Sequence, residues 1–289
     1  MQIITIGIDL AKTVFQVHGV CADGSVAFNK PLRRAQMLPF FAMLEPCLIG
    51  MEACGSSHHW ARELTRLGHE VKLMPPSYVK PYVKRGKSDA IDAAAVCEAV
   101  TRPTMRFVAI KSEEQQAMLC QHRVRQALVS QRTQLANMIR GLLSEFGIVM
   151  PTGVQHLREF AASMQVGELL DIPEMAEDVI ASLCDQFLAL DGRIDVLEKA
   201  IFATAKTDAR IDLLRSIPGI GPITASAMVA TIGSGQQFRS GRDFAAWIGL
   251  TPINKSSGGK ETLGRITRMG DQYLRHLLVI GMTSRVRRA

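Results

Sequence analysis

The sequence predicts an α/β domain followed by helical domains, and three observations support this prediction. Short apolar runs separated by turn residues fill the first 105 residues and alternate between strand and helix periodicity. Two long segments in the middle repeat apolar residues at alternating spacings of three and four. The last third is helical around a glycine-containing hairpin. We therefore expect an α/β plus all-α chain with domains at about 1–105, 106–205 and 206–289.

The first domain begins with a meander of three strands. The five expected strands lie at 2–8, 14–20, 25–30, 47–51 and 70–74. The expected helices lie at 35–44, 57–67 and 89–100, and Ser88 is a good N-cap for the last of them. This order of three strands, helix, strand, helix, strand and helix is that of the ribonuclease H-like fold. In that fold the first strand lies centrally beside the fourth.

Four acidic residues lie at the ends of these elements. Asp9 and Glu52 each close an apolar strand, whereas Asp89 and Asp92 open a helix and share one of its faces. Because the first and fourth strands are expected to be neighbours, the four carboxylates can form one pocket. Clustered carboxylates repel one another unless cations lie between them, so the pattern predicts a magnesium-dependent phosphoryl-transfer site. Each acid alone also fits a turn or cap residue, and the prediction depends on all four together.

Composition and charge narrow the class of protein. The chain has 289 residues, is 47% hydrophobic and carries a formal net charge of +7, which favours a large core and a polyanionic partner. Its apolar start is interrupted by Thr5 and Gly7 and runs into Asp9, so we expect no signal peptide, no membrane span and a bacterial cytoplasmic, nucleoid-associated protein. The six cysteines form no CxxC pair, which predicts reduced thiols.

The middle of the chain predicts an antiparallel coiled-coil arm. The apolar seam of its first helix, from Ser112 to about Phe146, is Val124, Leu128, Gln131, Leu135, Met138 and Leu142. The seam of its second helix is Ile180, Leu183, Phe187, Leu190, Ile194, Leu197 and Ile201. Such an arm serves as a spacer or an oligomerisation surface. Its arginines at 123, 125, 132 and 140 either contact nucleic acid or form a solvated charged face.

The last domain opens with a helix-hairpin-helix pattern, in which Leu213 to Gly221 is followed by Pro222 to Ala225. Gly219 and Gly221 permit a tight turn whose backbone amides can approach a phosphate. The alternative is a packing hairpin that contacts no DNA. A final helix is expected from Asp271 to Val286.

A polar loop follows an apolar helix that ends at Gly249. This loop, at 254–260, contains Ser256 and Ser257, and a serine beside a phosphodiester is a candidate nucleophile. Serines among glycines are more often a flexible linker, and that alternative stays open. The loop is followed by enough positive charge to hold a phosphate backbone, at Lys260, Arg265, Arg268 and Arg275. Lys87, in the basic loop before Ser88, adds to the expected nucleic-acid contacts.

These motifs together resemble the insertion-sequence-110 family of DEDD transposases. The resemblance is carried by Gly7-Ile8-Asp9-Leu10-Ala11-Lys12, Met51-Glu52-Ala53-Cys54-Gly55, Lys87-Ser88-Asp89-Ala90-Ile91-Asp92-Ala93, the hairpin from Ser216 to Gly221, and Gly249-Leu250-Thr251-Pro252 leading to Ser256-Ser257-Gly258. It implies a RuvC-like nuclease domain that holds Mg²⁺, with two ions per site, through Asp9, Glu52, Asp89 and Asp92. It also implies a C-terminal domain with a catalytic serine, which is Ser257, with Ser256 as a close rival.

The resemblance further implies recombination of double-stranded DNA guided by a structured bridge RNA, and assembly into dimers and tetramers through the coiled coil. Family members usually continue beyond the counterpart of Ala289, so either this is a truncated copy, whose last helix would lack some packing partners, or the tail is dispensable. The main alternative is a stand-alone RuvC-like structure-specific endonuclease that acts without the serine. A sugar-kinase-like ATPase is disfavoured because glycine-rich phosphate loops are missing, and a non-catalytic nucleic-acid binder is the third alternative.

Overall fold

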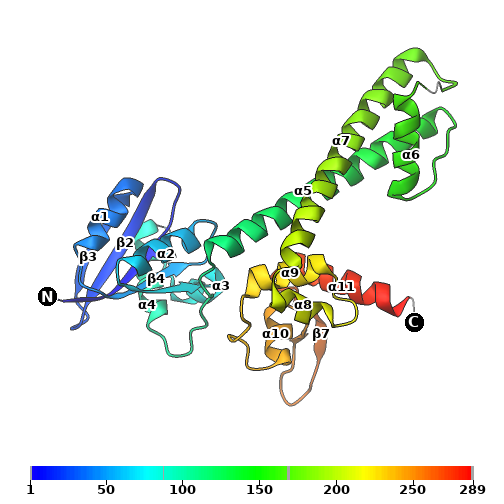
Figure 1. Ribbon diagram of the computed structural model, residues 1–289. Helices are drawn as coiled ribbons and strands as arrows, with labels where there is room; N and C mark the ends of the chain where they lie inside the picture. Colours follow the sequence, from blue (N-terminus) through cyan, green and yellow to red (C-terminus); the bar gives the residue numbers. More distant parts are fainter. Residues whose placement is uncertain (1, 87, 168–169, 288–289) are drawn as a thin grey trace. The chain divides into compact units, whose positions relative to one another are not determined.

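The chain folds into two compact units, Met1–Ser112 and Glu113–Ala289, seen in a computed structural model that describes residues 2–86, 88–167 and 170–287 (Figure 1). The first unit is α/β and the second is helical with one small sheet, which confirms the predicted fold class at this level. The boundary at Ser112 falls just before the first long helix. The division of the second unit into an arm and a terminal domain stays a prediction.

A five-stranded mixed sheet organises the first unit. Its strands are β1 (Ile3–Asp9), β2 (Val14–Cys21), β3 (Val26–Arg33), β4 (Leu48–Glu52) and β5 (Glu70–Met74). They lie in the order β3-β2-β1-β4-β5, with β1, β2 and β3 antiparallel and with β1, β4 and β5 parallel. The predicted neighbourhood of the first and fourth strands is therefore confirmed.

Helices cover both faces of this sheet. Because side chains alternate along a strand, Ile6 and Ile8 point to one face and Gly7 to the other. The isoleucines are fully buried in a core with α1 (Met37–Ala42) and α2 (Ser57–Arg66), where each large apolar side chain contributes roughly 1.5–3 kcal/mol. The other face packs against α4 (Asp89–Val100). Short helices η1 (Arg34–Gln36), α3 (Pro76–Val79) and η2 (Lys80–Tyr82) complete the unit.

The second unit begins with a pair of long antiparallel helices, α5 (Glu113–Glu145) and α7 (Glu174–Ala205), shown in Figure 1. The predicted seam of α7 is confirmed at five of its seven positions, where Ile180, Phe187, Leu190, Ile194 and Ile201 are buried, whereas Leu183 and Leu197 are half-buried. The predicted seam of α5 is wrong at Val124 and Met138, which are 49% and 56% exposed. An unpredicted helix, α6 (Val154–Gln165), packs against α7, so α5 buries a stripe centred on Ile139 and Leu143 instead.

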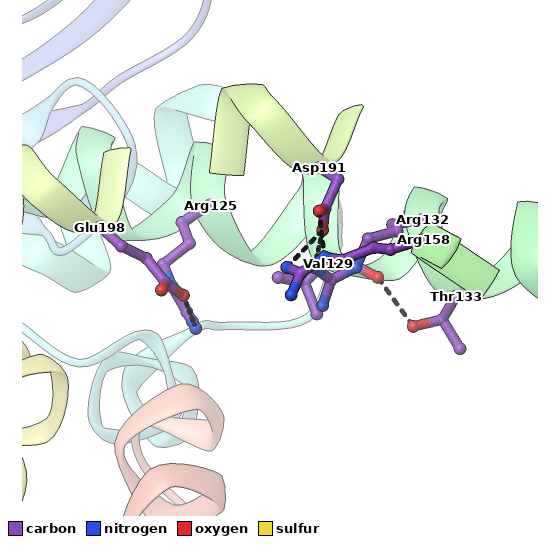
Figure 2. A network of polar contacts seen from close by, with 7 residues as sticks. All are labelled: Arg125, Val129, Arg132, Thr133, Arg158, Asp191 and Glu198. Carbon is purple, nitrogen blue, oxygen red and sulfur yellow. Dashed lines mark hydrogen bonds and ion pairs between the residues drawn. The ribbon is translucent and has the colours of Figure 1, made fainter. Parts of the chain in front are cut away.

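Arginines on α5 and α6 form hydrogen bonds and ion pairs with acids on α7 (Figure 2). Arg125 donates to Glu198 Oε1 at 2.8 and 2.5 Å, and Arg132 and Arg158 both donate to the buried carboxylate of Asp191. Burial alone raises the pKa of Asp191, but the hydrogen bonds from the two arginines outweigh it and lower that pKa. Arg140 donates to the Gly153 carbonyl at 2.7 Å. Of the four α5 arginines, three are therefore engaged inside the arm, which neither sequence interpretation anticipated.

The rest of the second unit carries the C-terminal elements. They are α8 (Ala209–Arg215), α9 (Pro222–Ile232), α10 (Gly241–Trp247), β6 (Pro252–Asn254), β7 (Leu263–Ile266) and α11 (Gln272–Val286). A buried histidine ties them to the arm, since His122 on α5 lies 3.1 Å from the Ser226 hydroxyl on α9 and 3.2 Å from the Tyr273 hydroxyl on α11. No helix in the described ranges offers an apolar stretch long enough to span a bilayer. All six cysteines are free thiols, as predicted.

Candidate active site

The four predicted acids lie where two parallel strands end and one helix begins. Residues β1 Ile8 and β4 Met51 are paired in register, and Asp9 and Glu52 each follow by one position. Alternation along the strands directs both carboxylates to the sheet face that α4 covers. Asp89 and Asp92 occupy the first turn of α4, whose N-cap Ser88 accepts a hydrogen bond from the Ile91 backbone at 3.4 Å.

The negative charges of these carboxylates repel one another and shift their pKa values. Burial raises the pKa of Asp9, and the charges of Asp89 and Asp92 raise it further. Burial likewise raises the pKa of Glu52, with contributions from Asp9 and Asp92. The two strand acids and the helix acids therefore form one repulsive cluster, whose ionised state is costly without a counter-charge.

Two glycines for which the sequence predicts no packing role bring α4 to this position. Gly7 and Gly50 are paired across β1 and β4, each two residues before an acid. A Cβ at Gly7 would lie 2.2 Å from the Ala93 carbonyl oxygen and 2.4 Å from the Cys97 nitrogen, and a Cβ at Gly50 would lie 2.8 Å from the Val100 Cβ. The absent side chains let α4 rest directly on the sheet. The available signal was glycine interrupting each apolar strand at the same distance from its acid.

The donor set suits a hard divalent cation, because it consists of carboxylate oxygens, the ligands that Mg²⁺ prefers. A cation would relieve the repulsion that raises the pKa of Asp9 and Glu52. Among the described side chains, however, no three His, Cys, Asp or Glu groups converge on a common ligand position. The acids therefore form a cluster whose ligand chemistry fits a metal, although the described side chains are not arranged in a coordination geometry.

The predicted serine loop is the end of a β-hairpin. Strands β6 and β7 pair antiparallel, and the Lys260 backbone nitrogen donates to the Ser257 carbonyl at 3.1 Å. Gly258 and Gly259 have φ values of 57° and 77°, the left-handed conformation that both central residues of a type I′ turn require. The two glycines therefore form a turn that continues the strand pairing, so the segment has hairpin geometry in this structure.

The two serines differ in their hydrogen bonds. Ser256 is built into the hairpin, since its hydroxyl accepts from the Thr262 nitrogen at 3.1 Å and its own nitrogen donates to the Asn254 side chain at 2.8 Å. Ser257 is exposed, and within the described ranges its hydroxyl forms no hydrogen bond. Ser257 is therefore the serine whose hydroxyl is presented outward without an internal role.

The base of the hairpin is held by close backbone packing. A Cβ at Gly249 would lie 2.2 Å from the Met269 carbonyl oxygen, and one at Gly270 would lie 2.0 Å from the Trp247 carbonyl oxygen. Arg275 donates to the carbonyls of Ile248 and Met269 at 2.7 and 2.8 Å. This arginine, expected beside phosphate, instead binds the hairpin base.

The other predicted nucleic-acid contacts are dispersed. Lys260, Arg265 and Arg268 are exposed on or beside the hairpin. Gly221 is the exposed N-cap residue of α9, whereas Gly219 packs against α11, where the Gly281 carbonyl oxygen lies 3.2 Å from its Cβ position. Lys87 lies outside the described residues.

Comparison with known proteins identifies the family. A family model described as "Transposase IS116/IS110/IS902 family" matches residues 211–289, and a second, for DEDD transposases of the IS110 type and described as "Transposase", matches residues 6–148. The "Probable family 20 transposase" of Pseudomonas aeruginosa is 49% identical over 288 residues, which cover 99% of this chain and 85% of that protein. The chain belongs to the IS110 family of transposases.

Two further relatives extend the comparison. The "Transposase for insertion sequence element IS1328" of Yersinia enterocolitica is 41% identical over 274 residues, or 95% of this transposase and 81% of the relative. A "Pilin gene-inverting protein" of Moraxella bovis is 28% identical over 204 residues, or 69% of this chain and 53% of the relative. The transposase is an enzyme that acts on DNA, and its DEDD group implies use of a divalent metal, as the sequence predicted.

Proposed function

We propose that this transposase cuts and rejoins the DNA strands of an insertion sequence, with Asp9, Glu52, Asp89 and Asp92 as the metal-binding acids and Ser257 as the nucleophile. The observation that carries the proposal is the electrostatic coupling of the four acids at neighbouring strand ends. The strand order β3-β2-β1-β4-β5 supports a RuvC-like nuclease domain. The exposed hairpin in the second unit supports the serine.

The acids act first by holding the metal. Two bound Mg²⁺ ions would polarise the scissile phosphate and neutralise the charge on the leaving oxygen. The residues of the chain supply the negative ligands and exclude bulk water from one side, because Asp9 and Glu52 are half-buried against α4. Burial and mutual repulsion raise their pKa values and so disfavour the ionised state, and a bound cation would offset this by stabilising the carboxylates.

The serine makes the reaction reversible. Its oxygen bonds to phosphorus, the phosphorus–oxygen bond of the strand breaks, the serine proton passes to solvent or a carboxylate, and the departing deoxyribose oxygen takes up a proton. Attack by a hydroxyl of another strand on the phosphoserine reverses these exchanges and restores Ser257. The bond energy of the phosphodiester is kept for rejoining, which hydrolysis by water would lose.

The alternative is a RuvC-like endonuclease that uses the acids without the serine. The name of the Moraxella bovis relative favours rejoining, because inversion of a gene requires that cut strands be joined again. The matched substitutions Ser257→Ala and Ser256→Ala separate the two functions on a supercoiled plasmid carrying the element's ends with Mg²⁺. We expect Ser257→Ala to abolish strand cleavage and joining and Ser256→Ala to retain both. Undiminished cleavage by Ser257→Ala would establish the endonuclease.

We also propose that the arm is an antiparallel coiled coil through which the transposase forms dimers or tetramers. An apolar groove of about 520 Å³ runs along α5 and α7, lined by Val124, Leu128, Leu188 and Val196 among others. Val124 and Val196 are 49% and 66% exposed there, which a partner arm would cover. Replacing both with serine is expected to produce monomers in sedimentation equilibrium. An unchanged oligomer would exclude this surface.

The final part of the proposal concerns nucleic acid. We infer that a structured bridge RNA guides target choice, that α8, the turn at Gly219 to Gly221 and α9 form a helix-hairpin-helix element, and that Lys260, Arg265 and Arg268 contact the DNA backbone. The support is the family resemblance, the net charge of +7 and the exposure of the three basic residues. Sequencing of co-purified nucleic acid is expected to recover one structured RNA. Undiminished recombination after complete RNase treatment would contradict the guide.

A further inference from the structure

A groove of about 630 Å³ lies beside α4 in the first unit. Its floor contains the buried residues Thr5, Cys21, Ala95 and Cys97, and its sides come from β2, β3, η2 and the exposed side of α4. The volume falls in the range of roughly 300–1,000 Å³ that small-ligand sites occupy. An apolar floor of this kind accommodates a flat, weakly polar group.

Three side chains that line the groove carry an aromatic ring, a positive charge and an imidazole. Tyr82 contributes an aromatic ring that is half-buried, and Lys84 contributes a positive charge at an exposed position. His18 contributes a buried Nδ1 atom that forms no hydrogen bond with any described residue. Glu98, the acid in the lining, is paired with Arg102 at 2.6 Å, so its charge is compensated.

The groove adjoins the acid cluster. Ala90 and Ile91, which line it, lie between Asp89 and Asp92 in the first turn of α4. Two hydrogen bonds link β2 to this turn: the Gln16 side chain, whose backbone lies opposite Asp9, donates to the Asn29 side chain at 2.6 Å, and Asn29 donates to the Ala90 carbonyl at 3.3 Å. One end of the groove therefore lies beside the acid cluster, and the groove extends along α4 from there to Thr101.

We infer that this groove binds one unpaired nucleotide of the DNA strand that is cut at the acid cluster. The Tyr82 ring stacks on the base, the His18 ring forms part of the groove wall, and Lys84 binds the adjoining phosphate. This inference rests on the proposed cutting site at the acids, since that site brings the strand to the groove. Extraction of a base here would unpair the duplex beside the scissile phosphate and hold the strand in place.

Photo-crosslinking in the absence of divalent metal tests the inference without requiring cleavage. The probe is a single-stranded oligonucleotide containing 5-iododeoxyuridine, mixed with the transposase, and the adducts are mapped by mass spectrometry. We expect adducts on the peptides containing Tyr82 or His18. Adducts only elsewhere, or stronger adducts there from the matching iodouridine RNA, would overturn the inference. Failure of Ser257→Ala to affect cutting would instead refute only the proposed function.

Affinity of the same probe, measured by fluorescence anisotropy, provides matched controls. Tyr82→Leu is expected to weaken binding about tenfold, as loss of one base-stacking partner does, whereas Tyr82→Phe keeps the ring and binds like the parent. Tyr78 is a second tyrosine, 45% exposed and outside the groove, so Tyr78→Leu is expected to have no effect. Equal loss in Tyr82→Leu and Tyr82→Phe, at matched melting temperatures, would contradict stacking.

Discussion

The acid cluster and the serine hairpin position their candidate catalytic groups in opposite ways, one inside a core and one on an exposed hairpin. Asp9 and Glu52 are half-buried at the ends of two core strands of the first unit. Helix α4 covers them because it packs directly on the paired glycines Gly7 and Gly50. Ser257 is fully outside the core of the second unit, on a two-stranded hairpin held by backbone pairing, a glycine turn and close contacts at its base. The acids are thus fixed by tertiary packing, whereas the serine is fixed by local backbone geometry.

This difference predicts which substitutions will disturb each site. Disturbing the core near the acids should unfold or displace them together, because they share one helix and one sheet. Disturbing the hairpin should alter the serine while the rest of the second unit stays folded, because every residue from Pro252 to Leu263 is exposed. The following experiments test this contrast.

The largest effect is expected from Gly7→Ala. Its methyl group would meet backbone atoms of Ala93 and Cys97 that no rotamer change can move aside, so α4 must shift from the sheet. We expect a loss of about 3 kcal/mol or more in urea unfolding of the first unit. Gly55→Ala is the control in the same unit, because nothing lies within 4 Å of that Cβ position. A loss below about 1 kcal/mol for Gly7→Ala would show that α4 does not depend on this contact.

Low pH is expected to destabilise the second unit, in which His122 joins α5 to α9 and α11. His122 is 1% exposed, and burial together with Arg125 lowers its pKa from 6.5 to about 4. The unfolded chain then binds a proton more readily, so stability falls as the pH drops from 6.5 towards 4. The loss between pH 7 and pH 5 is about 2 kcal/mol. His122→Gln should flatten this part of the denaturation profile, whereas exposed His276→Gln should leave it unchanged. An identical slope in His122→Gln would exclude this residue as its source.

The acid cluster is expected to respond to pH with the opposite sign. Because the pKa values of Asp9 and Glu52 are raised, the folded first unit gains stability as the pH falls through these values towards 3.8 and 4.5. Asp9→Asn should therefore stabilise the metal-free unit at pH 7, and solvent screening of the half-buried site keeps this effect smaller than that of His122. Mg²⁺ should raise the melting temperature of the parent and not of Asp9→Asn. Lower stability of metal-free Asp9→Asn would contradict the repulsion.

The smallest effect is expected from Gly258→Ala. A φ of 57° strains an alanine by about 1 kcal/mol, and the strain is confined to the turn. Hydrogen exchange at the Lys260 amide, which donates to Ser257, should accelerate about fivefold while the global melting temperature stays constant. Gly258→Asn is the matched control, because asparagine tolerates this conformation. A lowered global melting temperature would show that the hairpin belongs to the core.

The sequence foretold the acids better than their support. Apolar runs ending at Asp9 and Glu52 defined two strands, and Ser88 marked the helix start, so three local signals converged. The close packing of α4 on the sheet was not apparent from the sequence, because it depends on which helix covers the sheet face at Gly7 and Gly50. That contact is tertiary, and one sequence contains no direct record of it.

The second unit shows the same limit more strongly. The heptads of α7 fixed its buried face, but α5 shares its apolar stripe between α7 and the unpredicted α6, which displaced the expected seam from Met138 to Ile139. The serine segment reads as a linker by composition. Only positive φ at both Gly258 and Gly259, together with strand pairing of Asn254 and Leu263, makes it a hairpin.

The identity of the residue joined to DNA tests the mechanism most directly. A suicide substrate nicked near the cleavage point should trap the transposase on DNA with Mg²⁺, and mass spectrometry after nuclease digestion should find the remaining nucleotide on Ser257. The adduct should be absent from Asp9→Asn and Ser257→Ala and present in Ser256→Ala. A nucleotide on Ser256, or efficient cleavage with no protein–DNA adduct, would contradict Ser257 as the nucleophile.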